Sequence, residues 1–208
     1  MRQTPATPRY ALSFTSGALL MREALVAAPI YLRERDWGKV RALISEDNLL
    51  QTRTVRSAVR LGGEVVQRLA VLTDGEMALL AEATAPERGH LLWAAACRRY
   101  ELIGEFAEEV VRERFLLLTP TLSYDEFDGF IRGKALWHPE LDELKASTLQ
   151  RLRSNVFRML SEAGLLTDGG HIVQAVPSQR VAARLEARIP SDLRFFPLTG
   201  RRAGSIEA

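Results

Sequence analysis

Residues 145–173 read KASTLQRLRSNVFRMLSEAGLLTDGGHIV, and this stretch carries the pattern that decides the fold. Apolar residues recur in it at spacings of three and four, which predicts one buried stripe on an α-helix. The stripe consists of Leu149, Leu152, Val156, Met159, Leu160 and Ala163. Ser147 or Thr148 can cap the helix, because a side-chain oxygen there accepts an N–H of the first turn. Gly164 can end it in the left-handed conformation that glycine adopts without a Cβ penalty.

A second face of this helix carries Arg151, Asn155 and Arg158, together with Ser154. Residues 165–167 and 171–173, joined by Asp168-Gly169-Gly170, are typical of a short β-hairpin around a glycine-containing turn. A basic helix followed by a small hairpin is the layout of a winged helix, in which the helix enters a major groove and the hairpin touches the flanking backbone. A packed helix followed by a turn explains the same residues equally well.

A second arginine-bearing helix is expected in the N-terminal part. Asp36-Trp37 can cap a helix over 36–46, and Thr52 or Thr54 can cap another that reaches about residue 72. The outer face of this second helix carries Arg53, Arg56, Arg60 and Gln67. Its inner face is predicted to hold Val55, Ala58, Val59, Gly62, Val65, Val66 and Leu69. A helix, a short turn and an arginine-faced helix make residues 36–72 a helix-turn-helix candidate, although many helical bundles share this layout.

The glycine pair Gly62-Gly63 lies in the middle of the second arginine-bearing helix. Each glycine costs about 1 kcal/mol relative to alanine in a helix interior. Close packing of another helix against the pair is the simplest reason for that cost.

The rest of the chain predicts further helices, without the alternating strands and helices of an α/β fold. We expect them at about 17–35, with a kink or break at Pro29, and then at 74–83, 86–100, 101–117, from Ser123, and at 178–188. Trp93 and Trp137 are expected in the core. The fold class is therefore mainly α, a helical bundle with a helix-turn-helix-like N-terminal part and a C-terminal winged-helix-like unit that carries one small β-hairpin. Thr119-Pro120-Thr121 suggests two domains, 1–118 (helical) and 119–208 (winged-helix-like, with a tail).

Charge is distributed unevenly, although the net charge of the 208 residues is only +2. Residues 1–73 carry 11 basic and 6 acidic groups, residues 74–144 carry 7 and 15, and residues 145–208 carry 10 and 5. Two basic ends therefore flank an acidic middle. Nucleic-acid binding requires a local positive surface rather than a high total charge, so the two ends are candidate contact surfaces. The acidic middle is expected to be a solvated face and a surface for a protein partner.

Several classes of function find no support in the sequence. The single cysteine, Cys97, excludes an internal disulfide framework. Apolar runs are shorter than the roughly 18 residues of a membrane span, so we expect a cytoplasmic protein without membrane contact. Glu87-Arg88-Gly89-His90 is a single Glu-x-x-His, whereas a di-iron bundle requires two copies and two further carboxylates. We therefore expect no metal, no cofactor, no small-molecule substrate and no catalytic residues.

Five ordered blocks of sequence resemble the BrxA family of bacterial BREX (bacteriophage exclusion) defence loci. They are LSFTSG at 12–17, NLLQTRT at 48–54, LLWAAACRRY at 91–100, WHPEL at 137–141 and VFRMLSEAGLL at 156–166. The resemblance implies a mostly helical protein that binds double-stranded DNA. It also implies other BREX proteins as partners, in a system that marks host DNA by methylation and blocks phage replication. The family has no established catalytic residues, so none are assigned to this chain.

The sequence thus predicts a non-catalytic protein that binds double-stranded DNA through basic helix faces with modest sequence preference. A protein-interaction adaptor that docks other BREX subunits and an RNA-binding helical protein are the alternatives. The DNA-contact residues predicted here are Arg53, Arg56, Arg60, Lys145, Thr148, Arg151, Asn155, Arg158 and His171. The last of these lies at the predicted hairpin, where its imidazole could meet a phosphate.

Overall fold

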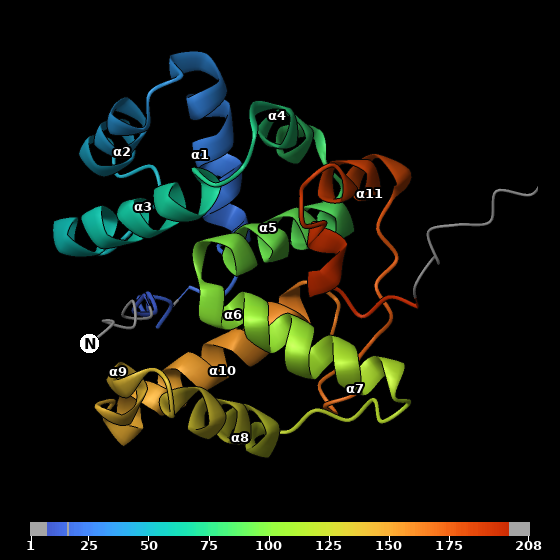
Figure 1. Cartoon of the computed structure of the whole chain (residues 1–208). Coiled ribbons are helices and arrows are strands. Elements are labelled where there is room, and N and C mark those ends of the chain that lie inside the picture. Colours follow the sequence, from blue (N-terminus) through green and yellow to red (C-terminus); the bar gives the residue numbers. More distant parts are fainter. Residues whose placement is uncertain (1–7, 16, 200–208) are drawn as a thin grey trace, which may run out of the picture.

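The structure, a computed structural model, describes residues 8–15 and 17–199, and it is mainly α-helical (Figure 1). The tail beyond Thr199 and most of the N-terminal arm lie outside the described residues. The α-helices are α1 (Met21–Glu34), α2 (Trp37–Glu46), α3 (Val55–Leu69), α4 (Asp74–Glu82), α5 (Ala85–Arg99), α6 (Glu101–Phe106), α7 (Glu113–Leu116), α8 (Tyr124–Ala135), α9 (Pro139–Asp142), α10 (Ala146–Glu162) and α11 (Gln179–Glu186). A π-helical segment, η1 (Ala107–Arg112), joins α6 to α7, and a 3₁₀ turn, η2 (Asp192–Phe195), follows α11.

Helix α5 lies at the centre of the molecule, with α1, α3 and α4 on one side and α6 and α10 on the other (Figure 1). Residues 89–97 of α5 are all buried, because the helix is apolar around most of its circumference. The Trp93 ring is fully buried, as predicted, and its Nε1–H donates to the carbonyl oxygen of Phe195 at 2.9 Å. The C-terminal pair Phe195-Phe196 thereby closes the core over α5.

Polar side chains start several helices as the sequence predicts. The Asp36 carboxylate accepts from Gly38 N and Lys39 N at the start of α2, and the Thr54 hydroxyl accepts from Ser57 N at the start of α3. Thr73 and Ser123 each form a capping box, and Ser178 caps α11. Each cap satisfies backbone N–H groups that have no partner inside the helix. The starts of these helices could therefore be predicted from the sequence.

Helix α1 departs from its prediction. It begins at Met21 rather than Gly17, after Leu20 in a left-handed conformation and without a side-chain cap. It also continues through Pro29 without a break. Residues 17–20 instead form a tight turn, in which Leu20 N donates to the Gly17 carbonyl oxygen at 2.9 Å, and Ala18 N of this turn donates to Asn155 of α10.

The Gly62-Gly63 prediction is confirmed at one position and wrong at the other. A Cβ built on Gly62 would lie 3.1 Å from Cγ2 of Ile44, so α2 packs closely against α3 there. A Cβ on Gly63 would meet no atom within 4 Å. Only Gly62 is therefore required by helix packing.

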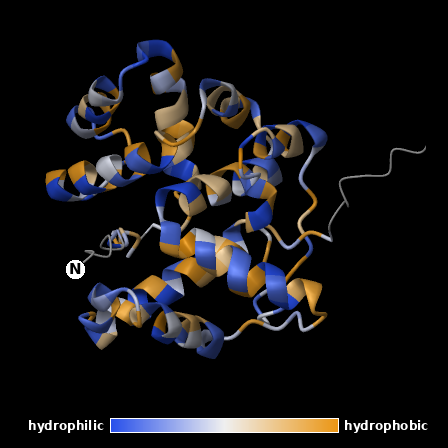
Figure 2. Ribbon diagram, in the orientation of Figure 1, coloured by the Kyte–Doolittle hydropathy of each residue, from blue (hydrophilic) through white to orange (hydrophobic). Residues whose placement is uncertain are grey.

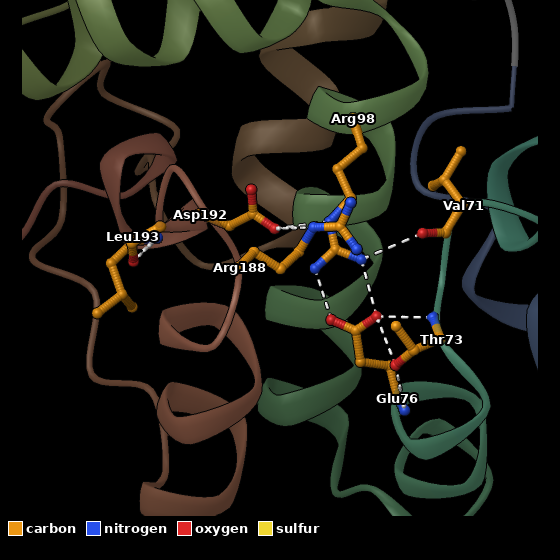
Figure 3. Close-up of polar contacts among 8 residues, drawn as sticks. Val71, Thr73, Glu76, Arg98, Arg188, Asp192 and Leu193 are labelled. Atoms are coloured by element: carbon orange, nitrogen blue, oxygen red, sulfur yellow. Dashed lines mark hydrogen bonds and ion pairs between the residues drawn. The ribbon is translucent and has the colours of Figure 1, made fainter.

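A buried cluster of charges joins the C-terminal segment to α4 and α5 (Figure 3). The Arg98 guanidinium donates to both carboxylate oxygens of Glu76, at 2.5 and 2.8 Å, and to Oδ2 of Asp192 at 2.6 Å. Burial by itself would raise the pKa of Glu76, but hydrogen bonds from Arg98 and Thr73 hold that pKa below its usual value. The cluster fixes the segment around Asp192 against helices α4 and α5.

Three short extended segments lie beside the end of α10. Leu166 pairs with Ile172 and Thr121 with His171 through isolated antiparallel bridges, and the described residues contain no longer strand. Further backbone bonds run from Thr167 N to His171 O (2.9 Å) and from Leu122 N to Gly170 O (2.7 Å). The turn thus has the predicted position, while the β-hairpin of a winged helix and the division into domains at residue 119 stay predictions.

The expectation that Trp137 lies in the core is wrong. Trp137 is 75% exposed, and its neighbour Leu136 is 79% exposed. The next residue, His138, is buried instead and stacks on Tyr10 with ring centroids 3.9 Å apart. Because the chain turns sharply between α8 and α9, the imidazole rather than the indole faces inward.

Candidate nucleic-acid interface

Helix α3 presents a basic surface at one edge of the molecule, beside α2 and away from α4 (Figure 1). The exposed residues at its start, here called the α3 face, are Arg53, Val55, Arg56, Val59 and Arg60. Arg53 and Arg56 form no hydrogen bond or ion pair with any residue that the structure describes. The α2 residues Lys39 and Arg41 are exposed as well. Two arginine side chains on this face are therefore available to an anionic partner.

The exposure of the two valines on this face differs from the prediction. Val55 and Val59 were expected on the inner side of α3, but they are 77% and 51% exposed. The residues that face inward are Ala58, Gly62, Val65, Val66 and Leu69. Val55 and Val59 share the side of Gly62, Val66 and Leu69 by helical spacing, but they precede Gly62, the residue at which α3 packs against Ile44 of α2. Hydrophobic and hydrophilic residues alternate around this helix in Figure 2.

The link that sets the position of the α3 face is held by Asn48. Its Oδ1 accepts from Thr52 N at 2.9 Å, and its Nδ2 donates to Thr52 O at 3.1 Å. Asn48 and Gln51 both adopt left-handed backbone conformations, with φ of 45° and 52°. The side chain of Asn48 thus closes a compact loop between α2 and α3. The link, residues 47–54, is longer than the roughly three to four residues of a standard helix-turn-helix turn.

Helix α10 presents the second predicted surface. The residues on it, here called the α10 face, are Lys145, Thr148, Arg151 and Arg158; Thr148 is half-buried and the others are exposed. Lys145 and Arg151 have no side-chain partner among the described residues. Lys145 is also the N-cap, and no side chain caps the helix, so the prediction that Ser147 or Thr148 caps it is wrong. Gly164 ends the helix with a φ of +71°, as predicted.

Asn155 does not belong to the exposed face, and its assignment as a DNA-contact residue is wrong. It is 7% exposed. Its Oδ1 accepts from Ala18 N at 3.0 Å, and its Nδ2 donates to Phe14 O at 2.8 Å. The amide is thus occupied by the backbone of the N-terminal segment, which lies across α10. Glu162 extends this contact by accepting from Leu19 N at 3.0 Å.

Arg158 and His171 flank an open cleft at the far end of α10. The Arg158 guanidinium is exposed and donates to Glu162 at 3.1 Å, which neutralises part of its charge. The cleft has a volume of about 500 Å³, and its lining includes Arg158, Tyr124, Phe157 and Asp168. His171 is exposed beside it, in the turn that pairs with Thr121. The nearby carboxylates make this end of α10 less positive than the α3 face.

Of the Glu-x-x-His pair of the sequence, Glu87 is held by structural hydrogen bonds, while the His90 ring packs edge-on against Phe196 with centroids 5.7 Å apart. Glu87 accepts from Arg180 Nε at 2.7 Å and from the Ser178 hydroxyl at 2.6 Å, and it also forms a capping box with Thr84. The hydrogen bonds from Arg180, Ser178 and Thr84 lower the pKa of Glu87. Burial lowers the pKa of His90, which favours its neutral form.

Residues 8–15 and 17–199 contain no group of three or more His, Cys, Asp or Glu side chains that could hold a metal ion. Within these ranges, no helix has both the length and the apolar character to cross a membrane.

Comparison with known proteins places the chain in one family. A family model described as BrxA matches residues 8–188. A BREX protein BrxA from Paramagnetospirillum magneticum is 26% identical over 163 residues, which is 78% of this chain and 82% of that protein. A BREX protein BrxA from Escherichia coli (strain HS) is 27% identical over 148 residues, which is 71% of this chain and 70% of that protein.

The fold has a crystallographic counterpart. An uncharacterized protein from Magnetospirillum magneticum superimposes with a TM-score of 0.81 at 24% identity, and the match covers 91% of this chain and all of that one. This likeness shows the fold, and the family model that matches residues 8–188 shows the family. The chain belongs to the BrxA family.

Proposed function

We propose that this protein is a non-catalytic DNA-binding component of a BREX anti-phage system. Two relatives named BREX protein BrxA support the assignment to that system. The proposal includes other BREX proteins as partners. The observation that carries DNA binding is the α3 face, where Arg53 lies just before α3 and Arg56 and Arg60 lie in its first two turns.

The physical reason is the charge of the duplex. Double-stranded DNA carries one negative charge per about 1.7 Å of its axis, and cationic side chains that neutralise phosphates release bound counterions. Arg53 and Arg56 form no ion pair with a described residue, so binding a phosphate costs them no internal contact. An arginine already held by a carboxylate, such as Arg158, would have to give up that contact first.

The α3 face is therefore the proposed primary surface, and the α10 face the second. The second surface has two cations without a partner among the described residues, Lys145 and Arg151, but Asp142 and Glu143 come three and two residues before Lys145 in the chain. If the turn at 167–170 acts as the wing of a winged helix, His171 contacts the phosphate backbone next to the groove that α10 enters.

Duplex binding by charge-matched variants tests this proposal. One variant carries Arg53→Gln and Arg56→Gln, a second carries Lys145→Gln and Arg151→Gln, and a control carries Arg132→Gln and Arg184→Gln. The control removes the same charge from exposed positions on α8 and α11. In a low-salt gel shift we expect the first variant to bind at least about tenfold more weakly than the wild type, the second to be intermediate, and the control to be unchanged.

Two results would count against the proposal. Absence of duplex binding by the wild type at low salt would remove DNA binding altogether. Affinity equal to that of the wild type in all three variants would mean that neither proposed surface contributes to duplex binding. Competition between duplex DNA and structured RNA at matched salt separates the DNA function from the RNA-binding alternative, which predicts that the RNA competes better.

The adaptor alternative is favoured by a different observation, the exposure of large apolar side chains. Leu117, Leu118, Leu136 and Trp137 are 70–86% exposed. The acidic middle segment supports it less well, because Glu105 and Glu109 pair with Lys134, and Glu108 pairs with Arg194. Co-purification of BREX partners with a Leu136→Ser and Trp137→Ser variant tests the alternative, which predicts a loss of association with duplex binding intact.

A further inference from the structure

The α3 face contains apolar groups as well as charges. Val55 is 77% exposed and Val59 is 51% exposed, and both lie in the first two turns of α3. They are four residues apart, so their side chains lie one above the other on the helix. Arg56 and Arg60 form the neighbouring row with the same spacing. The exposed surface at the start of α3 is thus one apolar row beside one cationic row.

The fold leaves these two valines largely exposed at the start of α3. β-Branched residues are less favourable in helices than alanine, lysine or glutamine, and an exposed side chain recovers none of this cost by burial. By helical spacing the two valines lie on the same side of α3 as the buried residues Gly62, Val66 and Leu69, but at the exposed start of the helix. A partner that covers the start of α3 would complete the burial of this apolar stripe.

We propose that Val55 and Val59 contact the 5-methyl groups of thymines in the major groove and give the protein a preference for thymine-containing DNA. This inference rests on the proposed function. The major groove displays one apolar group, the thymine methyl, and apolar side chains recognise it by contact. The minor groove displays none, so an apolar row at the start of a groove-reading helix selects the major groove.

Charge complementarity favours DNA over a protein partner for this row. The acidic residue nearest to it on α3 is Glu64, and its carboxylate is held inside the molecule by Arg68 and by the Tyr100 hydroxyl. Next to the valines, Arg53 and Arg56 are exposed without an ionic partner among the described residues, while the exposed carboxylates Glu46 and Asp47 lie at the other end of the α2–α3 link. A partner must supply anionic groups on both sides of an apolar contact, and the two phosphate strands that border a major groove do so.

The spacing of the valines also fits. Residues four apart in an α-helix are separated by about 6 Å along the axis. Base pairs rise by about 3.4 Å, so a helix lying along the groove places the two side chains roughly two base pairs apart. The start of a recognition helix is the part that contacts base edges in helix-turn-helix proteins, and both valines lie there.

The test is a comparison of two duplexes by fluorescence anisotropy at one low salt concentration. One duplex alternates adenine and thymine, and the other has every thymine replaced by uracil, which lacks only the methyl group. We expect the wild type to bind the thymine duplex more tightly by about fourfold for each methyl contact, and therefore by roughly tenfold or more. The Val55→Ala, Val59→Ala variant is expected to bind both duplexes alike.

Two controls separate methyl recognition from other effects. Val176→Ala removes an exposed valine (80% exposed) that lies outside α3, and it should keep the full thymine preference. Arg56→Gln should weaken binding to both duplexes by the same factor, because it removes a charge and not a methyl contact. Circular dichroism verifies that each variant is folded, which is expected because all the substituted side chains are exposed.

The outcomes distinguish this inference from the function on which it rests. Equal binding of the two duplexes by the wild type, or a thymine preference that survives in the double valine variant, overturns the inference and leaves DNA binding intact. Failure of the wild type to bind any duplex overturns both. If the double variant instead loses self-association in sedimentation while its thymine preference is unchanged, the valines form a protein contact and the inference is wrong.

Discussion

Asn155 illustrates how a polar residue on a basic helix can serve structure rather than binding. Its position next to Arg151 and Arg158 in the helical pattern predicts a surface residue, yet its amide joins α10 to the backbone at Phe14 and Ala18. Periodicity identifies a face of a helix but not which distant segment covers it. The LSFTSG block was visible in the sequence, but nothing in it indicated that its backbone would contact α10.

The Asn155→Ala variant should lose both bonds. It leaves a buried N–H at Ala18 and a buried carbonyl at Phe14 without a partner, so we expect the free energy of unfolding to fall by about 1–3 kcal/mol in urea denaturation. Arg151→Ala is the control, since that side chain is exposed and should change stability by no more than about 0.5 kcal/mol. Equal stability of Asn155→Ala and wild type would mean that the N-terminal segment does not hold α10.

At the scale of a helix, the start residues could be predicted and the exposed side could not. Asp36, Thr54, Ser123 and Ser178 all cap helices at starts that the sequence predicted, because capping depends on local chemistry within a few residues. The exposure of Val55, Val59 and Trp137 depends on which elements lie nearby in space. A hydrophobic pattern alone assigns such residues to the core, and here that assignment was wrong.

The glycine pair of α3 provides a test at this scale. Gly63→Ala should stabilise the protein by about 0.5–1 kcal/mol, because the new methyl group meets no atom within 4 Å and the helix gains a better helix former. Gly62→Ala should gain less or be destabilising, since its Cβ would lie 3.1 Å from Ile44. Thermal or urea unfolding of the two variants measures the difference. A larger gain at Gly62 than at Gly63 would contradict the packing of α2 against α3.

For the whole molecule, mainly helical architecture and the family followed from the sequence, whereas the connection between the two ends of the chain did not. The C-terminal segment is held through Asp192 and Arg98, and the N-terminal segment through Asn155 and Glu162. Both contacts join residues more than 90 positions apart. Local sequence patterns carry no information about such pairs.

The free energy of unfolding should fall at acid pH because of two buried carboxylates that form ion pairs, Glu76 and Glu87. The pKa values of Glu76 and Glu87 are lowered in the folded state below the ordinary value of 4.5. The unfolded chain therefore binds more protons as the pH falls through 4.5, so the stabilisation is complete above that pH and is lost below it. Urea denaturation across this range should show a steep loss, and Glu76→Gln should make the loss shallower.

Glu46→Gln is the control for the pH experiment, because Glu46 is exposed and has no hydrogen-bond partner among the described residues. It should leave the pH dependence of wild type unchanged. A Glu76→Gln protein whose stability falls with acid as steeply as that of wild type would mean that Glu76 does not contribute to the acid sensitivity.

The salt dependence of duplex binding tests the central claim, DNA contact through the α3 face, most directly. For the wild type, the logarithm of the association constant should fall linearly with the logarithm of the salt concentration. The Arg53→Gln, Arg56→Gln variant should have a slope shallower by up to about 1.8, because each lost phosphate contact removes about 0.9. The Arg132→Gln, Arg184→Gln control should keep the wild-type slope. Identical slopes for all three proteins, or no binding by the wild type, would contradict the claim.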